Sequence, residues 1–193
     1  LAVQDDTDQA ATTTTAANIM SFSTTDYALG ASLVTSTKLT AGYSGLYNIQ
    51  FSVQFKNTVN DPEFVDVWFR KNGTNVAASN SKFGISQRKS AGIPSHMIGS
   101  LNFFIGLEKN DYVELVWRPS DIGVTIEHFG TDTSPTRPAT PSIIATMSYL
   151  SSNGYTSNLF TMPYISATTA GSATISHPAN SVSGMTYKYI IVG

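Results

Sequence analysis

The side chains that most often carry out chemistry are sparse and scattered in this sequence. The chain has three histidines and no cysteine. His96, His128 and His177 lie far apart, and none belongs to a His-x-His or His-Glu-x-x-His pattern that would hold a metal ion. Without cysteine, the chain has no thiolate nucleophile and no disulfide bond. These residues therefore predict neither a metal centre nor thiol chemistry.

Hydroxyl and carboxyl groups also lack a catalytic arrangement. Serine and threonine are common, at 24 residues each, so counting alone does not exclude a Ser/His/Asp triad. The stretch Gly42-Tyr43-Ser44-Gly45 is one residue short of a Gly-x-Ser-x-Gly nucleophile elbow. The clustered acidic residues are Asp5, Asp6 and Asp8 near the N-terminus and Glu108, Asp111 and Glu114 around a turn. The first cluster lacks the glycine and distal glutamate of a calcium loop and the second is typical of a solvated turn, so we expect no enzyme activity and no cofactor.

The strongest structural signal is the stretch 45–55, Gly-Leu-Tyr-Asn-Ile-Gln-Phe-Ser-Val-Gln-Phe. Apolar side chains alternate with uncharged polar ones, which predicts a strand with one apolar face and one amide-rich face. The polar members are Asn48, Gln50, Ser52 and Gln54. Because amides can form hydrogen bonds at a subunit contact without the cost of burying an ion, we interpret this face as part of an interface. An ordinary solvent face without charges is the alternative.

Composition indicates an all-β protein whose surface is partly covered by neighbours. Hydrophobic residues make up 41% of the chain and charged residues only 12%, which is about half of the usual share of charged residues. The net charge is −2 and there is no basic run, which argues against a nucleic-acid partner. No apolar stretch approaches the roughly 18 residues of a membrane helix, so we expect no membrane partner.

Further alternating segments predict a series of short strands. The predicted strands cover 19–22, 33–39, 46–55, 64–71, 74–79, 97–107, 112–117, 124–128 and 142–150. Asn72-Gly73 is typical of a two-residue hairpin turn, whose central positions both need a positive φ. We expect a loop over 81–95 and an extended, proline-rich connection over 131–141. Short strands with regular turns and no helical periodicity predict a β-sandwich, and specifically a jelly roll.

The chain is expected to have three regions. The low complexity of 4–17 predicts that residues 1–17 form an extended N-terminal arm. Residues 18–150 are expected to form the jelly-roll domain, and residues 151–193 a β-rich C-terminal extension.

The C-terminal extension is predicted to be ordered and to pack on its own oligomer or on a neighbouring subunit of a larger assembly. Its strand-like pieces are 159–165, 173–176 and 186–192, and Lys188 is its only charged residue. If 186–192 added as a strand to an existing sheet, Tyr187, Tyr189 and Ile191 would be buried together. A small satellite lobe on the same subunit is the alternative.

Four motifs follow one another through the predicted domain. They are Gly45-Leu46-Tyr47, Val-Trp-Phe-Arg-Lys-Asn-Gly over 67–73, Leu-x-x-x-Asp-Tyr-Val-Glu-Leu-x-Trp over 107–117, and Ser-Pro-x-x-Pro-Ala-x-Pro-Ser-Ile-Ile over 134–144. In this order they resemble the tumour necrosis factor/complement-globular-head superfamily, in the form found among structural proteins of tailed phages, notably cyanobacterial phages. The resemblance covers roughly residues 7–150. One departure is Asn110, which stands where the family usually has glycine and which also tolerates a positive φ.

The resemblance implies a homotrimeric jelly roll with a structural or binding role. Applied to this chain, it implies a non-enzymatic virion protein that decorates or cements a phage capsid at the particle surface. Its partners would be the major capsid protein or other virion proteins, with a host-surface glycan as a further candidate. The alternatives are the receptor-binding head or knob of a phage fibre and a cellular complement-like recognition module.

The trimer interface and the glycan site are each assigned candidate residues. The interface set is Asn48, Gln50, Ser52 and Gln54 on the first long strand, with Asn102, Phe104, Thr146 and Ser148 at matching phase on partner strands. Trp68 and Tyr112 are candidates for a carbohydrate platform, for which cross-strand packing or a subunit contact is the alternative.

Overall fold

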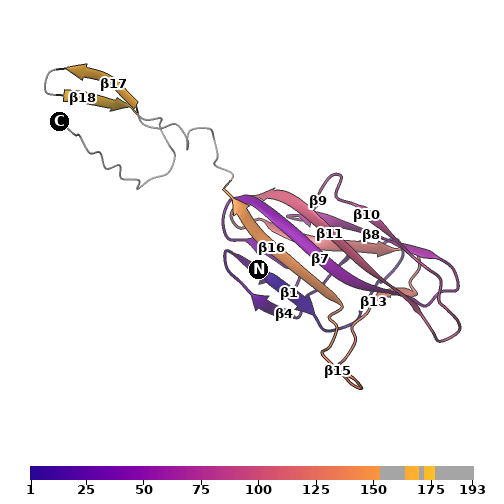
Figure 1. The fold of residues 1–193 in the computed structure, drawn as a ribbon. Coiled ribbons are helices and arrows are strands. Elements are labelled where there is room, and N and C mark those ends of the chain that lie inside the picture. The colour runs from indigo at the N-terminus through magenta and orange to yellow at the C-terminus, as the bar shows by residue number, and fades with distance from the viewer. Residues whose placement is uncertain (153–163, 170–171, 177–193) are drawn as a thin grey trace. The chain divides into compact units, whose positions relative to one another are not determined.

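The computed structural model describes residues 1–152, together with 164–169 and 172–176. The chain divides into two compact units, Leu1–Ser152 and Asn153–Gly193. Every regular element of the described residues is a β-strand (Figure 1). The predicted all-β class is therefore confirmed, and the antiparallel sheets of the first unit form a β-sandwich.

One sheet of the sandwich, sheet I, is built around the long strand β7. Its strands are β1 (Ala2–Asp5), β2 (Gln9–Ala10), β4 (Thr24–Tyr27), β7 (Gly45–Asn57), β11 (Ser95–Leu107), β13 (Val124–Ile126) and β16 (Ile143–Ser151). β7 pairs with β11 along its whole length on one side, and with β16 and then β13 on the other. β1 and β4 extend the sheet beyond β16. Within the described residues β11 is an edge strand, because it pairs with β7 alone.

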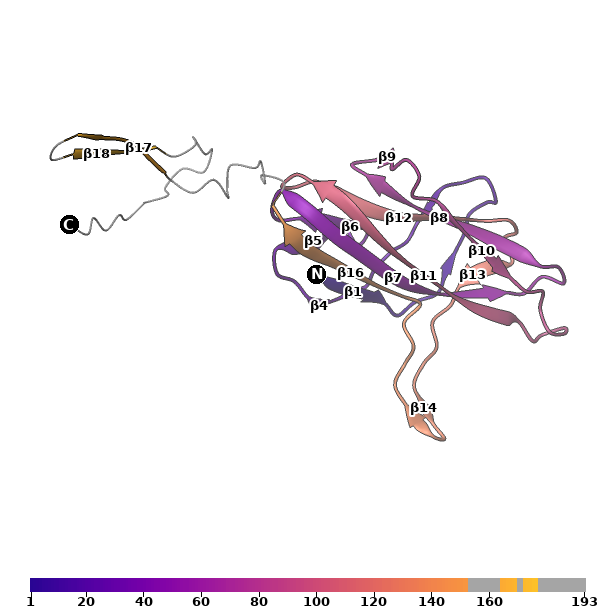
Figure 2. The same cartoon turned by 45° about the horizontal axis from the view of Figure 1, so that its top comes forward.

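The other sheet, sheet II, covers the inner face of sheet I (Figures 1 and 2). Its strands are β3 (Asn18–Ile19), β5 (Ala31–Val34), β6 (Lys38–Ala41), β8 (Glu63–Lys71), β9 (Thr74–Asn75), β10 (Ser81–Ile85) and β12 (Tyr112–Pro119). The main order is β10-β8-β12-β6-β5. A small hairpin of β14 (Asp132–Thr133) and β15 (Thr136–Arg137) projects from the sandwich (Figure 2). In the second unit, β17 (Tyr164–Thr169) pairs with β18 (Ser172–Ser176).

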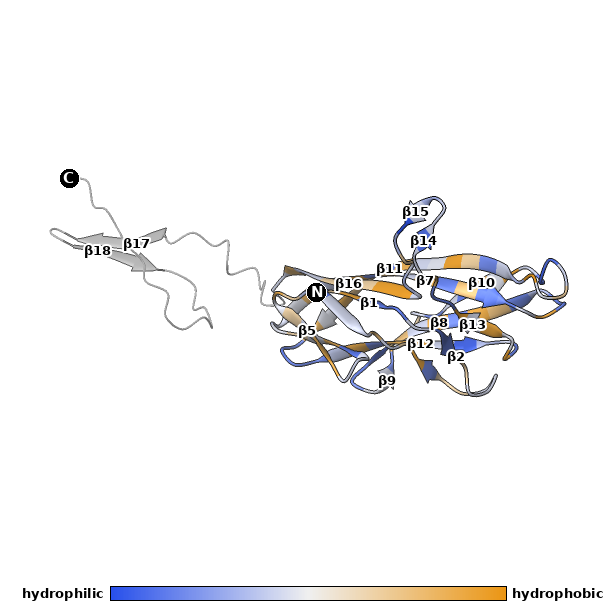
Figure 3. Cartoon of the chain, turned by 90° about the horizontal axis from the view of Figure 1, so that it is seen from below, coloured by the Kyte–Doolittle hydropathy of each residue, from blue (hydrophilic) through white to orange (hydrophobic). Residues whose placement is uncertain are grey.

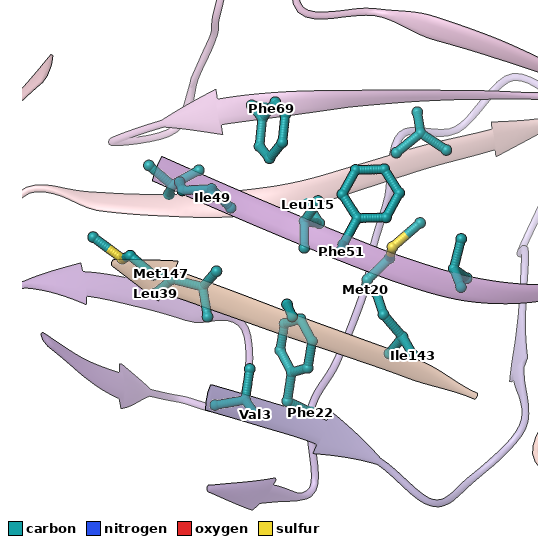
Figure 4. Close-up of a cluster of buried hydrophobic side chains, with 14 of the residues drawn as sticks. Val3, Met20, Phe22, Leu39, Ile49, Phe51, Phe69, Leu115, Ile143 and Met147 are labelled. Atoms are coloured by element: carbon teal, nitrogen blue, oxygen red, sulfur yellow. The ribbon is translucent and has the colours of Figure 1, made fainter. Parts of the chain in front are cut away.

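The hydrophobic core fills the space between the two sheets. The alternation in β7 turns Tyr47, Ile49, Phe51, Val53 and Phe55 inward, and all five are buried. The ring of Phe51 meets Phe69 of β8 edge to face, with centroids 6.1 Å apart. Figure 4 shows side chains from β7, β8, β12 and β16 pointing into this common space. The two faces predicted for 45–55 are therefore confirmed.

The N-terminal residues differ from the predicted arm. Ala2–Asp5 forms β1 and pairs with β16, and Gln9–Ala10 pairs with β13. Val3 is fully buried against the core. Asp5 is buried too. Its carboxylate accepts hydrogen bonds from the backbone N and the hydroxyl of Thr7, which offset the cost of burying it. The prediction extended the low-complexity stretch 4–17 back to residue 1, although Leu1 and Val3 supply buried apolar side chains at alternate positions of the sheet I edge.

Three predicted strand boundaries also differ from the structure. The segment 33–39 is not one strand but part of the β5–β6 hairpin, whose turn places Thr35 and Ser36 at φ 51° and 59°. The predicted loop over 81–95 contains β10, and the return strand after Asn72-Gly73 is only β9. Asn72 and Gly73 do have positive φ values, of 48° and 80°, as the hairpin turn requires.

Two turns at one end of the sandwich are joined by a network around Asp111. Its carboxylate accepts hydrogen bonds from Asn72 Nδ2 at 2.6 Å and the backbone N of Glu108 at 2.8 Å, and Lys71 Nζ lies 2.8 Å from it. Lys71 Nζ also donates to the carbonyl of Gly106 on β11, at 3.1 Å. Burial acts to raise the pKa of Asp111, but these donors outweigh it and hold the pKa at about 2. The network therefore ties the edge of sheet I to sheet II.

Candidate interaction surface

The amide face is the outer face of sheet I around β7. It consists of Asn48, Gln50, Ser52, Gln54, Asn102, Phe104, Thr146 and Ser148. The strand register brings these residues together, since Asn102 and Thr146 lie directly opposite Gln50 on either side. Phe104 and Ser148 flank Asn48 in the same way. The eight residues predicted for the interface thus lie on one continuous surface, while their contact with another subunit stays a prediction.

Large apolar side chains stand exposed within and beside the amide face. Ile98 is 61% exposed, Phe104 55% and Ile144 43%. On β11, Ile98 lies opposite Gln54 of β7 and Phe104 lies opposite Asn48. On β16, Ile144 lies opposite Ser52 of β7. Figure 3 shows hydrophobic and hydrophilic stretches following each other along these strands. Isolated exposed apolar residues are ordinary, but a group on one sheet face is typical of an interaction surface.

The charged groups of this outer face lie at its end rather than its centre. Lys56 Nζ is 2.6 Å from Glu127 Oε1, and His96 Nε2 is 2.7 Å from Glu127 Oε2. His96 is directly opposite Lys56, one row beyond the last uncharged pair. Between Leu46 and Gln54, neither β7 nor its partner positions on β11 and β16 carry a charged side chain. The distribution resembles an interface, with an uncharged centre and ions at the rim.

The outer face of sheet II has a different character. Asp66 of β8 is 2.9 Å from Arg118 Nη2 of β12 and 3.9 Å from Lys82 Nζ of β10. Lys82 Nζ also lies 3.9 Å from the centre of the Phe64 ring. These charges alternate in sign across three neighbouring strands and satisfy one another. Such an arrangement is typical of a face that remains in water.

One amide oxygen on the amide face has no hydrogen-bond partner. Asn48 Oδ1 is shielded from solvent and accepts no hydrogen bond within the described residues. An unpaired buried acceptor costs about 1–3 kcal/mol. Native structures hold few such groups, and each one calls for an explanation.

A hollow opens beside the amide face, where β1, β4 and β16 meet the loops before β5 and β7. It has a volume of about 900 Å³, and three tyrosine rings line it, those of Tyr27, Tyr43 and Tyr149. We call it the tyrosine hollow. Thr146 and Ser148 belong both to its lining and to the amide face. The sequence did not indicate this site, because its three aromatic residues come from segments about 16 and 106 positions apart and carry no shared motif.

The two aromatic residues predicted as a carbohydrate platform lie on sheet II instead. Trp68 is half-buried, and its Nε1 donates to Asn75 Oδ1 at 2.9 Å. Lys38 Nζ lies over the ring of Tyr112, 4.5 Å from its centre. The indole N–H and the phenol ring are thus engaged by neighbouring side chains. Their arrangement favours the packing alternative.

The other predicted features have the following outcomes. Within residues 1–152 and the two later strands, no three His, Asp or Glu residues gather in a way that could hold a metal ion. The backbone N of His128 donates to Asp8 Oδ1 at 2.8 Å, so this part of the predicted acidic arm is attached to the sandwich. The docking residues Tyr187, Tyr189 and Ile191 lie outside the described residues.

Among the described residues, no helix has the length and apolar character needed to cross a bilayer.

No model of a known protein family matches the chain. A search of curated proteins likewise finds no match.

Proposed function

We propose that the chain is a non-enzymatic structural protein of a phage particle, which forms a homotrimer and decorates or cements the capsid. The observation that carries this proposal is the amide face, an uncharged surface with exposed apolar side chains within and beside it and ions at its rim. A face of this kind loses little by leaving water, because no ion has to be desolvated.

The strand pairing supports a jelly roll as the fold that presents this face. Eight strands in chain order are β1, β6, β7, β8, β10, β11, β12 and β16. They pair from the outside of this order inward: β1 with β16, β6 with β12, β7 with β11 and β8 with β10. A long antiparallel ribbon rolled into two sheets has this pattern. The motif resemblance to trimeric jelly rolls of phage virions supports the assignment to a particle.

Sedimentation of the purified full chain tests the trimer. We expect a single species of three times the chain mass at micromolar concentration. A monomer under these conditions would refute the trimer.

The place on the particle is tested by a mass-spectrometric inventory of purified phage that encodes the chain. Copy numbers comparable with that of the major capsid protein indicate decoration, and much lower numbers indicate a fibre or tail.

A receptor-binding head of a phage fibre is the second candidate function. The tyrosine hollow favours it, because a concave and largely apolar site with a few polar groups is typical of ligand binding. In either role the protein acts by binding, and we expect no turnover by the isolated chain.

A further inference from the structure

The three tyrosines that line the tyrosine hollow are exposed to solvent rather than buried in the core. Tyr27 is 60% exposed, Tyr43 59% and Tyr149 42%, and Leu29 beside them is 73% exposed. Tyr43 and Tyr149 meet edge to face, with ring centres 5.9 Å apart. Large aromatic surfaces are therefore presented at several angles around one space. Tyrosine is well suited to binding, because a rigid ring gives much contact area for little loss of conformational freedom.

The walls of the hollow are held in place by a buried tyrosine. Tyr47 is fully buried, and burial raises the pKa of its hydroxyl. That hydroxyl donates to the carbonyl of Tyr43 at 2.8 Å and accepts from the backbone N of Tyr43 at 3.2 Å. Gly42 N donates to the carbonyl of Gly30 at 3.0 Å, which joins the two loops that carry the rim. The ring of Tyr149 is supported from below by Tyr47, at 5.4 Å between ring centres. The site is therefore preorganised before any ligand arrives.

The polar side chains of the hollow are uncharged, and most of them have no hydrogen-bond partner among the described residues. The hydroxyls of Tyr27, Tyr43 and Tyr149 make no hydrogen bond to another described residue. Thr146 and Ser148 add two aliphatic hydroxyls that have no partner among the described residues, whereas Ser44 Oγ already accepts a hydrogen bond from the backbone N of Lys109 at 3.0 Å. No charged side chain lines the hollow. Each hydroxyl can both donate and accept, so the site offers mixed hydrogen-bonding capacity without selecting for an ion.

We propose that the tyrosine hollow binds a neutral saccharide. A sugar ring has an apolar face of C–H groups that packs on an aromatic ring, and its hydroxyls both donate and accept hydrogen bonds. Both requirements are met by the three rings and the free hydroxyls of the hollow. The volume of about 900 Å³ lies within the range of small-ligand sites, roughly 300–1,000 Å³, and leaves room for more than one sugar unit.

The chemistry of the lining disfavours other classes of ligand. Phosphorylated, sulfated and uronic-acid ligands would lose water from their charges without gaining a cationic side chain in return. A purely aliphatic ligand would cover five hydroxyls and leave them without partners. All residues that line the hollow belong to one chain, so the proposal goes beyond the proposed trimer, although Thr146 and Ser148 are shared with the amide face.

The test is a binding screen with the full chain. The probes are neutral di- to tetrasaccharides of glucose, galactose, mannose and N-acetylglucosamine, with sulfated and uronic-acid analogues as the charged arm. Saturation-transfer NMR detects binding, and calorimetry measures the affinity. We expect at least one neutral probe to bind with a Kd of about 1 mM or tighter. No binding across the neutral panel, or a preference for the charged analogues, would overturn the proposal.

Matched variants locate the site. Tyr27→Ala and Tyr43→Ala are each expected to weaken binding about tenfold or more, whereas Tyr27→Phe keeps the ring and loses less. Tyr112→Ala makes the same change on sheet II and should bind as the unaltered chain does. Binding that survives both alanine changes in the hollow would refute this location.

Sedimentation of the same variants separates the saccharide proposal from the trimer proposal. Loss of sugar binding with an intact trimer supports the hollow as a saccharide site. Simultaneous loss of the trimer would instead identify the hollow as a contact between copies of the chain.

Discussion

The two outer faces of the sandwich are built from the same kind of strand but have opposite surface chemistry. On sheet II, the row Lys82, Asp66 and Arg118 runs across β10, β8 and β12, with each charge beside its opposite. On sheet I, the corresponding central row is Asn102, Gln50 and Thr146, and it carries no charge. Both faces lie over one shared core, so folding alone does not require the difference. The proposed trimer accounts for the contrast, because it would cover the amide face and leave the outer face of sheet II in water.

Because the two sheets share one core, a single substitution in that core should destabilise the whole sandwich. Phe51→Ala removes a ring that is only 4% exposed and that packs on Phe69 of the other sheet. We expect it to lower the free energy of unfolding by about 3–5 kcal/mol, because it leaves a cavity between the sheets. Urea denaturation at fixed protein concentration measures the loss.

Phe104→Ala is the matched control for Phe51→Ala. Phe104 is also a phenylalanine of sheet I, but it points outward and is 55% exposed. Its removal should change the stability of a dissociated chain by less than about 1 kcal/mol. A larger loss for Phe104→Ala than for Phe51→Ala would contradict this assignment of inner and outer faces.

Charging the amide face should separate assembly from folding. Gln50→Glu replaces an amide with an isosteric carboxylate at the centre of the predicted contact. In a trimer it would bring three like charges towards one another, and we expect association to weaken by about 10- to 100-fold. Sedimentation over a concentration series measures the shift.

Gln87→Glu makes the same chemical change on an exposed loop that follows β10 of sheet II. It should leave both association and stability unchanged. If Gln50→Glu and Gln87→Glu sediment alike, the amide face is not a contact, and its lack of charge has no bearing on assembly.

The contrast between the faces could be predicted only in part from the sequence. The period-two alternation in 45–55 correctly predicted which side chains of that strand share a face. The same alternation in the strands that contain Asn102 and Thr146 correctly placed these two residues on the face of Gln50. The β5–β6 hairpin was missed because its turn residues, Thr35 and Ser36, carry no glycine or asparagine signal. β1 was missed because polar neighbours outnumber its apolar residues. The tyrosine hollow depends on long-range loop packing, which no local pattern encodes.

The Asp111 network joins the two sheets, and it should make stability depend on pH. The pKa of Asp111 is about 2 in the folded protein, against an ordinary value of 3.8. A carboxyl with a lowered pKa stabilises the fold above its unfolded pKa, and this contribution is lost as the pH falls through the folded value. We expect Asp111→Asn to cost about 2 kcal/mol at pH 7 and almost nothing near pH 2. Urea denaturation at pH 7, 4 and 2 checks this, and a cost independent of pH would assign the effect to lost hydrogen-bond geometry alone.

The smallest expected effect concerns the charged row of sheet II. Asp66→Asn keeps the shape of a side chain that is 12% exposed but removes its ion pairs with Arg118 and Lys82. We expect a loss of about 1 kcal/mol in the free energy of unfolding, because Arg118 and Lys82 are partly hydrated and can turn to water. The difference from the unaltered chain should shrink in high salt, which already screens these pairs. Association should be unaffected, since this face is predicted to remain in solvent. If Asp66→Asn weakened the trimer as much as Gln50→Glu, both faces would contact other subunits, and the distinction drawn from their charges would fail.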